Sequence, residues 1–338
     1  MASAVLDLRS RPLKDLRISL TDRCNFRCTY CMPRSVFGPG YQFLTPSSVM
    51  SFDEIVRLVQ ISQGLGVENI RLTGGEPLLR TGLDHLINRL SQVKGIRQIL
   101  LTTNGSRLTQ PLAKRLKESG LTRVTISLDA LDEETFKSIN DVGFSSQGVL
   151  QAIDYAAEAG LTPVKINMVV KKNVNADQIL TMADRFRHSG HILRFIEFMD
   201  VGNSNRWSYQ DVVSGQSIVE TIHEKWPLKP LAPSRPGEVA RRYQYADGGG
   251  EIGIISSVSQ PFCTSCTRAR LSAEGKLYLC LFANQSVDLL TPLRQGADDQ
   301  ELAFLWRTAW TTRDDQYSLD RAAIPVMRNK VEMSHIGG

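Results

Sequence analysis

The 338-residue sequence has no cysteine outside two groups of three, at positions 24, 28 and 31 and at positions 263, 266 and 280. It also has no run of eighteen apolar residues, and no basic segment followed by an apolar one near its start. The clustered cysteines argue against a secreted disulfide framework and for ligands in a reducing compartment. The other two absences argue against a membrane-spanning helix and a secretory signal. We therefore expect a cytoplasmic protein without a membrane partner.

A strong excess of one charge is missing as well. The chain carries 40 Lys and Arg against 35 Asp and Glu, a net charge of +5, and the basic residues are spread along it. Nucleic acid is therefore not an expected partner, whereas a small polyanion would suit a few basic residues directed inward. The 42% hydrophobic and 22% charged content is typical of a globular protein, and the length allows one barrel-sized domain or two domains.

Strand and helix patterns alternate over the first two hundred residues. Strands are predicted at 16–20, 69–73, 98–103, 123–128, 164–170 and 192–198, and helices at 52–64, 83–93, 112–119, 133–138, 149–159 and 176–187. Strands separated by helices pair in parallel through right-handed crossovers. Six units are fewer than the eight of a closed barrel, so we expect an α/β fold with a partial (βα)6 TIM-like barrel. A doubly wound open sheet is the alternative.

The alternation stops at about residue 203. Four prolines between 226 and 237 predict a stiff loop, and short strands are predicted beyond it at 241–245, 252–255, 269–272 and 276–279. These strands predict a smaller mixed module that completes the side of the barrel. We therefore divide the chain into a barrel domain, 1–202, and a C-terminal module, 203–338.

The first cysteine group has C-x3-C-x2-C spacing, with Cys24, Cys28 and Cys31 directly after the first predicted strand. A [4Fe-4S] cluster normally takes four protein thiolates, so three would leave one iron open. Zinc is less favoured because no His lies within fifty residues of Cys31. The spacing resembles the signature of the radical S-adenosylmethionine (SAM) enzymes. That resemblance implies a [4Fe-4S] cluster whose open iron is chelated by SAM, and reductive cleavage of SAM to a 5′-deoxyadenosyl radical.

The second group, Cys263, Cys266 and Cys280, also offers only three ligands. A zinc site completed by a distant His, such as His223 or His335, is one interpretation. A second [4Fe-4S] cluster with an open iron is the other.

Polar and glycine-rich motifs follow the first four predicted strands, where a barrel of this type places its working groups. Gly74-Gly75 suits a backbone that a ligand approaches closely. Arg268 and Arg270 are two residues apart in an extended segment, so both side chains point to one side, where they could bind phosphate oxygens. Arg17, Arg71 and Lys165 lie inside strands, where a buried cation is costly unless an anion meets it.

Taken together, these motifs resemble one family within the radical SAM enzymes. The matching elements are C-N-F-R-C-T-Y-C-M-P, T-G-G-E-P, C-x2-C-x-R-x-R, the late Cys280 and the terminal Gly-Gly. They resemble the GTP 3′,8-cyclases of molybdenum-cofactor biosynthesis, from about residue 12 to the end. The resemblance implies two [4Fe-4S] clusters, with SAM on the first and GTP on the second. The radical would abstract the ribose 3′ hydrogen, and C3′ would attack guanine C8 to give 3′,8-cyclo-7,8-dihydroguanosine 5′-triphosphate.

The same resemblance assigns individual residues. It gives Cys24, Cys28 and Cys31 to the first cluster, Cys263, Cys266 and Cys280 to the second, Tyr30, Gly75, Ser127 and Met199 to SAM, and Arg17, Arg71, Thr102, Lys165, Arg268, Ala269 and Arg270 to GTP. Arg268, Arg270, Gly337 and Gly338 are the expected catalytic residues, because the Gly-Gly tail is implied to reach into the mouth of the active site. A reducing electron-donor protein and a downstream pterin-forming enzyme are the implied partners, and a homodimer remains an option.

Two other functions compete with this interpretation. A peptide-modifying radical SAM maturase would also carry a cysteine-rich C-terminal module, but the Arg268 and Arg270 pair and the lack of further cysteines argue against it. An iron-sulfur electron carrier or assembly scaffold would leave the glycine-rich strand ends unexplained.

Overall fold

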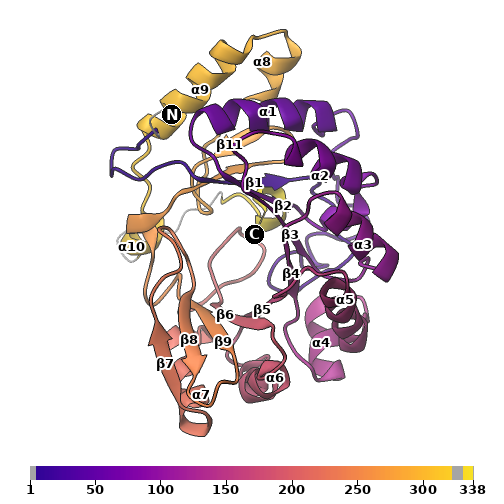
Figure 1. Cartoon of the computed structure of the whole chain (residues 1–338), viewed down its shortest axis with the longest axis vertical. Coiled ribbons are helices and arrows are strands. Elements are labelled where there is room, and N and C mark those ends of the chain that lie inside the picture. Colours follow the sequence, from indigo (N-terminus) through magenta and orange to yellow (C-terminus); the bar gives the residue numbers. More distant parts are fainter. Residues whose placement is uncertain (1–4, 322–329, 338) are drawn as a thin grey trace.

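The computed structural model describes residues 5–321 and 330–337. Its centre is one open, curved sheet with the strand order β12-β11-β10-β1-β2-β3-β4-β5-β6-β9-β8-β7 (Figure 1). The strands are β1 (Asp15–Ser19), β2 (Asn69–Thr73), β3 (Gln98–Thr103), β4 (Arg123–Ser127), β5 (Lys165–Val170), β6 (Ile192–Glu197), β7 (Leu228–Leu231), β8 (Arg241–Tyr245), β9 (Glu251–Ile255), β10 (Arg268–Leu271), β11 (Lys276–Tyr278) and β12 (Val287–Asp288). The sheet curves like a barrel without closing, which confirms the partial-barrel prediction.

The parallel part of the sheet is larger than predicted. Strands β1 to β6 pair in parallel as expected, and the C-terminal part of the chain adds β10 beside β1 and β9 beside β6, both in parallel. Eight strands therefore run in the same direction. The predicted short strands thus extend both sides of the sheet and do not form a separate one. Strands β10 and β9 pair with the open edges of β1 and β6, and β11 and β8 then add antiparallel to them.

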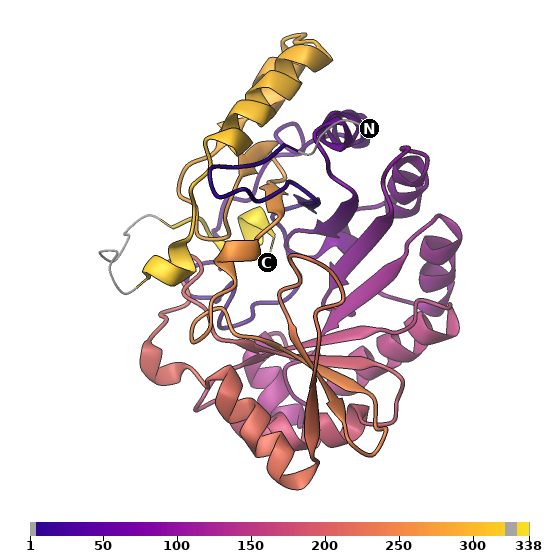
Figure 2. The same ribbon diagram turned by 60° about the vertical axis from the view of Figure 1, so that its left-hand side comes forward.

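Most helices cover the outside of the sheet, whereas the last one lies inside its curve (Figures 1 and 2). They are α1 (Phe52–Gly64), α2 (Leu83–Ser91), α3 (Gln110–Glu118), α4 (Glu133–Asn140), α5 (Ser146–Glu158), α6 (Ile179–Phe186), α7 (Gly215–Lys225), α8 (Leu290–Arg294), α9 (Asp299–Thr311), α10 (Tyr317–Asp320) and α11 (Met333–Ile336). The six predicted helices are confirmed with end shifts of a few residues. Ser51 and Glu54 form a capping box at the start of α1. No helix in the described parts of the chain is long and apolar enough to cross a membrane.

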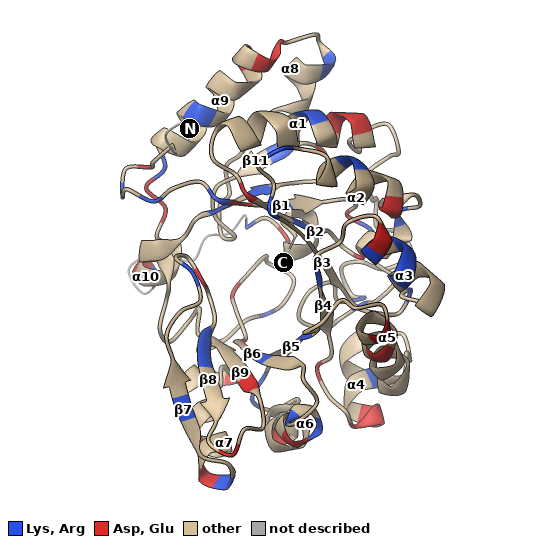
Figure 3. Ribbon diagram, in the orientation of Figure 1, with Lys and Arg blue, Asp and Glu red and all other residues tan. Residues whose placement is uncertain are grey.

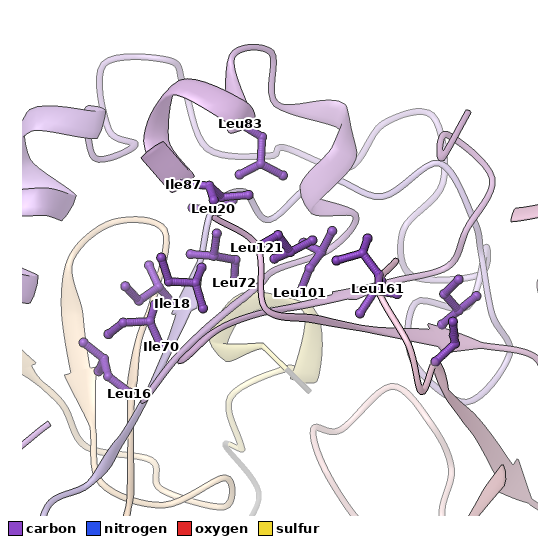
Figure 4. Packing of buried hydrophobic residues seen from close by; sticks show 14 of the residues in the cluster. Leu16, Ile18, Leu20, Ile70, Leu72, Leu83, Ile87, Leu101, Leu121 and Leu161 are labelled. Atoms are coloured by element: carbon purple, nitrogen blue, oxygen red, sulfur yellow. The ribbon is translucent and has the colours of Figure 1, made fainter. Parts of the chain in front are cut away.

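The hydrophobic core lies between the sheet and these helices. Leu16, Ile18 and Leu20 alternate along β1 and pack with apolar residues of β2 and α2 (Figure 4). Because successive side chains of a strand point to opposite faces, Arg17 points to the concave inner side. The same alternation brings the polar residues of the other strands into the interior of the barrel.

Two predictions for the C-terminal part were wrong. Residues 228–231, assigned to a stiff loop, form the edge strand β7, which pairs with β8 and tolerates Pro230 because one side of it is unpaired. Helices α7 and α9 were not predicted. Helix α9 begins with a capping box formed by Asp298 and Glu301, a local signal that identifies its start.

Candidate active site

The loop after β1 carries the first cysteine group and is fixed to helix α4. Phe26 is buried against Phe136 and Phe144. The amide of Arg27 donates to the Asn140 carbonyl (2.9 Å), and the Arg27 guanidinium binds carbonyls within the loop. The backbone between the cysteines is therefore held in place by α4 and by the loop itself.

The three cysteines of this group are half-buried and lie close enough together to affect one another's charge. Burial, assisted by the nearby Glu76, raises the pKa of Cys24 to about 11. Burial raises the pKa of Cys28, and the negative charges of Asp129 and of the other two cysteines add to this rise. Burial and the charge of Cys24 raise the pKa of Cys31 in the same way. Such thiols ionise only when positive charge is brought among them, which the irons of a cluster would do. The donor set fits an iron-sulfur cluster.

Gly74 and Gly75 pack against this loop. A Cβ atom on Gly74 would overlap the Thr21 carbonyl oxygen, and one on Gly75 would overlap the Arg23 carbonyl oxygen. The next residue, Glu76, is buried and accepts hydrogen bonds from Leu78 N, Thr103 Oγ1 and Asn104 N. The T-G-G-E-P motif thus joins the cysteine loop to the ends of β2 and β3. Both positions therefore require glycine because the protein's own backbone lies against them.

Tyr30 and Ser127 also lie at the C-terminal ends of the strands. The Tyr30 hydroxyl donates to Asp129 (2.7 Å), whose other carboxylate oxygen accepts from the amide of Val169 on β5. Burial raises the pKa of Asp129 to about 6. Tyr30 is therefore held in place by Asp129, which lies just beyond β4.

The second cysteine group surrounds a small cavity of about 50 Å³, lined by all three thiol residues together with Met199, Phe262, Arg268 and Arg270. Burial raises the pKa of Cys280 to about 11. Burial also raises the pKa of Cys266, but the Arg268 and Arg313 guanidiniums outweigh it and lower that pKa to about 6. Cys266 is thus prepared to act as a thiolate ligand.

The two histidines of the zinc interpretation lie elsewhere. His223 Nδ1 accepts from the Leu228 amide, and His335 pairs with Glu274 (3.0 Å). Neither lines the cavity of the second cysteine group, so neither completes a zinc site there. Within residues 5–321 and 330–337, no three His, Cys, Asp or Glu side chains stand close enough to hold a single metal ion. A cluster joins its thiolates through separate irons and does not require that spacing.

A larger cavity of about 350 Å³ fills the interior of the barrel. It shares Met199, Phe262, Arg268, Arg270 and Leu281 with the small cavity, so the second cysteine group opens onto it. Its lining includes eight basic side chains: Arg17, Arg71, Arg123, Lys165, Arg194, Arg235, Arg268 and Arg270. Of the acidic side chains in the described part of the chain, two line it as well, Asp15 and Glu238. Figure 3 shows basic segments on strands of the sheet, whereas the outer helices carry both signs.

Most of these cations have no counter-charge. Among the described residues, only Arg235 of the eight forms an ion pair, with Asp15 (3.0 Å). Arg71 donates to the hydroxyls of Thr102 (3.1 Å) and Thr125. Burial lowers the pKa of Arg71 to about 9 and that of Lys165 to about 7, and the neighbouring cations add to both shifts. An anion with several charges would remove this repulsion.

The predicted GTP residues converge on this cavity with one exception. Arg17, Arg71, Thr102, Lys165, Arg268 and Arg270 line it, whereas Ala269 alternates to the other face of β10 and is fully buried. Met199 lines both cavities, and Tyr30, Gly75 and Ser127 line neither. Sequence reasoning missed Arg123, Arg194 and Arg235. The rule that selected Arg17, a cation inside a predicted strand, would also have found Arg194 on β6.

The end of the described chain reaches into the barrel. Helix α11 lies inside the curve of the sheet (Figure 2), and Arg270 donates to the carbonyls of Ile336 and Gly337. Gly337 has a φ of 71°, and a Cβ on it would overlap Thr73 Cγ2. Upstream, Glu332 accepts from Asn203 N (2.9 Å) and Ser204 N (3.1 Å). Gly338, the last predicted catalytic residue, lies outside the described residues.

Comparison with known proteins gives similarities over both parts of the chain. Residues 18–186 match the Radical SAM superfamily, and residues 191–319 match the family described as Molybdenum Cofactor Synthesis C. Over their whole lengths, the chain is 46% identical to the GTP 3′,8-cyclase of Staphylococcus saprophyticus and 45% identical to that of Staphylococcus aureus.

A solved structure has a similar fold at low identity. The Streptococcus suis protein SuiB bound to S-adenosylmethionine aligns with a TM-score of 0.65 and 16% identity, over 93% of this chain and 68% of that one.

Proposed function

Since the chain belongs to the radical SAM superfamily and, within it, to the GTP 3′,8-cyclase family, we propose that it cyclises GTP in the cavity between its two cysteine groups. A 5′-deoxyadenosyl radical from SAM would remove the ribose 3′ hydrogen to give 5′-deoxyadenosine, and C3′ would bond to guanine C8. One further electron and a proton would then reduce the resulting nucleotide radical. The product is 3′,8-cyclo-7,8-dihydroguanosine 5′-triphosphate. The observation that carries this proposal is the basic cavity opening onto the second cysteine group.

The phosphate chain is the part of the substrate that the cavity explains best. A triphosphate carries several negative charges, and Arg17, Arg71 and Lys165 line the cavity without ion pairs among the described side chains. Guanidiniums form paired, charge-assisted hydrogen bonds with phosphate oxygens. We assign these three residues, with Thr102 and Arg194, to the ribose and the phosphates.

The cysteine groups are assigned to two [4Fe-4S] clusters. Cys24, Cys28 and Cys31 hold the first, and Cys263, Cys266 and Cys280 hold the second, beside the guanine. A cluster held by Cys24, Cys28 and Cys31 would supply the electron for the reductive cleavage of SAM. Tyr30, Gly75, Ser127 and Met199 orient SAM. Arg268 and Arg270 fix the base and the ribose, and Arg270 also holds the backbone of the Gly337 tail next to them.

The remaining assignments concern the setting of the reaction. Residues 1–202 form the barrel with the first cysteine group, and residues 203–338 form the module with the second cysteine group and the Gly-Gly tail. The six cysteines are free, which suits a reducing compartment such as the cytoplasm. A reducing protein supplies both electrons that the reaction needs, and a pterin-forming enzyme consumes the product. A homodimer is compatible with these roles.

One anaerobic assay tests the proposal. The reconstituted protein is reduced with SAM, with and without GTP, and 5′-deoxyadenosine and the cyclised nucleotide are quantified. We expect both products in about equal amounts and only when GTP is present. Equal amounts of 5′-deoxyadenosine with and without GTP would favour the maturase alternative, because a peptide would then be the missing substrate. No cleavage at all would favour an electron carrier.

A further inference from the structure

The cavity contains one carboxylate that the proposed reaction does not use. Glu238 lines its wall beside Arg123, Lys165 and Arg194. The other carboxylate, Asp15, already has its partners: it pairs with Arg235 and accepts from Thr267 Oγ1 (2.5 Å). Glu238 forms no ion pair within 4 Å among the described residues. It is therefore an acidic side chain in a site whose other features attract anions.

Glu238 is held at the cavity by its own loop. Its carboxylate accepts from the Ser234 amide (2.7 Å) and the Ser234 hydroxyl (3.0 Å), and its amide donates to the Arg235 carbonyl. The loop is attached to the barrel at two further points. Arg235 pairs with Asp15 at the start of β1, and Gly237 sits so close to Thr267 that a Cβ would come within 2.8 Å of its hydroxyl oxygen.

The charge of Glu238 reaches the three cations on β4, β5 and β6. Burial lowers the pKa of Arg123, Lys165 and Arg194, and at each of them Glu238 is the carboxylate that opposes this lowering. Arg123 and Lys165 begin their strands, and Arg194 is the third residue of β6. The second cysteine group borders another part of the cavity, next to Arg268 and Arg270.

We propose that Glu238 is an internal counter-ion to Arg123, Lys165 and Arg194, the cations that bind the phosphate end of the substrate. The triphosphate must displace or approach this negative charge in order to bind them. This inference rests on the proposed function, which places the guanine at the second cysteine group and hence the phosphates toward these three cations. Glu238 then weakens the binding of the phosphate chain and limits how tightly the cavity retains nucleotide.

The test compares nucleotide affinity in matched variants of the reconstituted protein. Glu238→Gln removes the charge, while the amide oxygen can still accept the Ser234 hydrogen bonds. Glu251→Gln is the control, because Glu251 lies outside the cavity lining, pairs with Arg242 (2.6 Å), and changes the net charge equally. GTP, GMP and inorganic tripolyphosphate are the probes, measured by anaerobic equilibrium binding, and iron content and circular dichroism check the fold.

We expect Glu238→Gln to bind GTP and tripolyphosphate at least about threefold more tightly, because it removes a negative charge that opposes the phosphates, and a charge interaction at a partly exposed site is worth up to about a factor of five. GMP should gain less, since one phosphate spans less of the cavity. Glu238→Asp, which keeps the charge, should remain close to the parent protein.

Equal affinities in Glu238→Gln and the parent protein would overturn the inference, and so would an equal gain in Glu251→Gln, which would make it an effect of net charge. Weaker GTP binding in Glu238→Gln would also overturn it and would indicate a cation-mediated role for the carboxylate. If GTP failed to bind while tripolyphosphate still showed the gain, the proposed substrate would be wrong and the counter-ion role would stand.

Discussion

Lys165 shows how a single residue responds to the crowding of positive charge in the cavity. Burial, with Arg194, Arg123 and Arg71 nearby, lowers its pKa from 10.5 to about 7. Above pH 7 the side chain is therefore mostly neutral in the empty protein. A phosphate placed beside it favours the charged form and raises the pKa again.

We accordingly expect GTP binding at pH 8 to take up as much as about one proton, and binding at pH 6 to take up almost none, because Lys165 is then already charged. Calorimetry in two buffers with different ionisation enthalpies measures this number. Lys165→Met should bind GTP more weakly and without the uptake at pH 8. Equal uptake in Lys165→Met would show that another group gains the proton.

The second cysteine group offers another test at the level of single side chains. Cys263→Ser should lose roughly half of the iron while Cys24, Cys28 and Cys31 keep theirs, because the two groups lie in separate segments of the chain. Iron analysis and visible absorption measure this loss. GTP affinity should fall at least about tenfold if the second cluster holds the guanine. Retention of full iron content would contradict the assignment of two clusters.

At the scale of elements, a buried charge network fastens the second cysteine segment to the beginning of the chain. Asp7 is fully buried and pairs with Arg11 (2.7 Å) and Arg313 (3.1 Å). Arg11 in turn donates to the Cys263 carbonyl and Arg313 to the Cys266 carbonyl. Three segments that are far apart in the sequence thus fix the backbone that presents two of the cysteines.

Asp7→Asn removes the closest carboxylate from two buried guanidiniums, so we expect it to lower the free energy of unfolding by about 3–5 kcal/mol. Urea unfolding followed by tryptophan fluorescence measures the change. Asp53→Asn is the control, since the exposed pair of Asp53 with Arg89 should contribute less than about 1 kcal/mol. Similar losses in both variants would contradict the importance of burial.

Local patterns predicted the elements well where each element follows its own periodicity. The strands at 69–73 and 98–103 and the helix at 52–64 were predicted with the bounds of β2, β3 and α1. The pattern failed at β7, where Pro230 indicated a loop, because edge pairing depends on a neighbour that local sequence does not reveal. It also could not show that β9 and β10 join opposite sides of one sheet, since strand order is a property of long-range pairing.

The site could likewise be predicted only in part from the sequence. Cysteine spacing located both groups, and cations inside strands located Arg17, Arg71 and Lys165. Arg123 and Arg235 escaped because they lie at a strand start and in a loop, where a basic residue is ordinarily solvated. Only the folded chain shows that these positions border the same cavity.

At the scale of the whole molecule, the C-terminal tail at Gly337 lies against the first strands of the sheet. This contact gives a prediction for the tail. A Cβ at Gly337 would overlap Thr73 at the end of β2, and the backbone there has a φ of 71°. Gly337→Ala should therefore displace the tail and reduce formation of the cyclised product at least about tenfold without loss of iron. Product analysis with iron determination measures both effects.

Gly190→Ala is the matched control for this variant, because Gly190 has a φ of 76° with open space around its Cβ position. It should cost some stability and leave product formation nearly unchanged. Addition of one residue after Gly338 should also abolish cyclisation with both clusters intact. Full activity of either tail variant would show that the tail takes no part in the reaction.

The placement of β9 and β10 on either side of the first six strands has a consequence for biosynthesis. While the ribosome is still translating, β1 and β6 emerge with bare backbone donors and acceptors, and β1 stays uncovered until residue 271 has left the exit tunnel. The nascent chain therefore passes through a partly folded stage in which unpaired strand edges favour aggregation. Chaperone protection is most valuable during that interval, and iron loading is best completed after it.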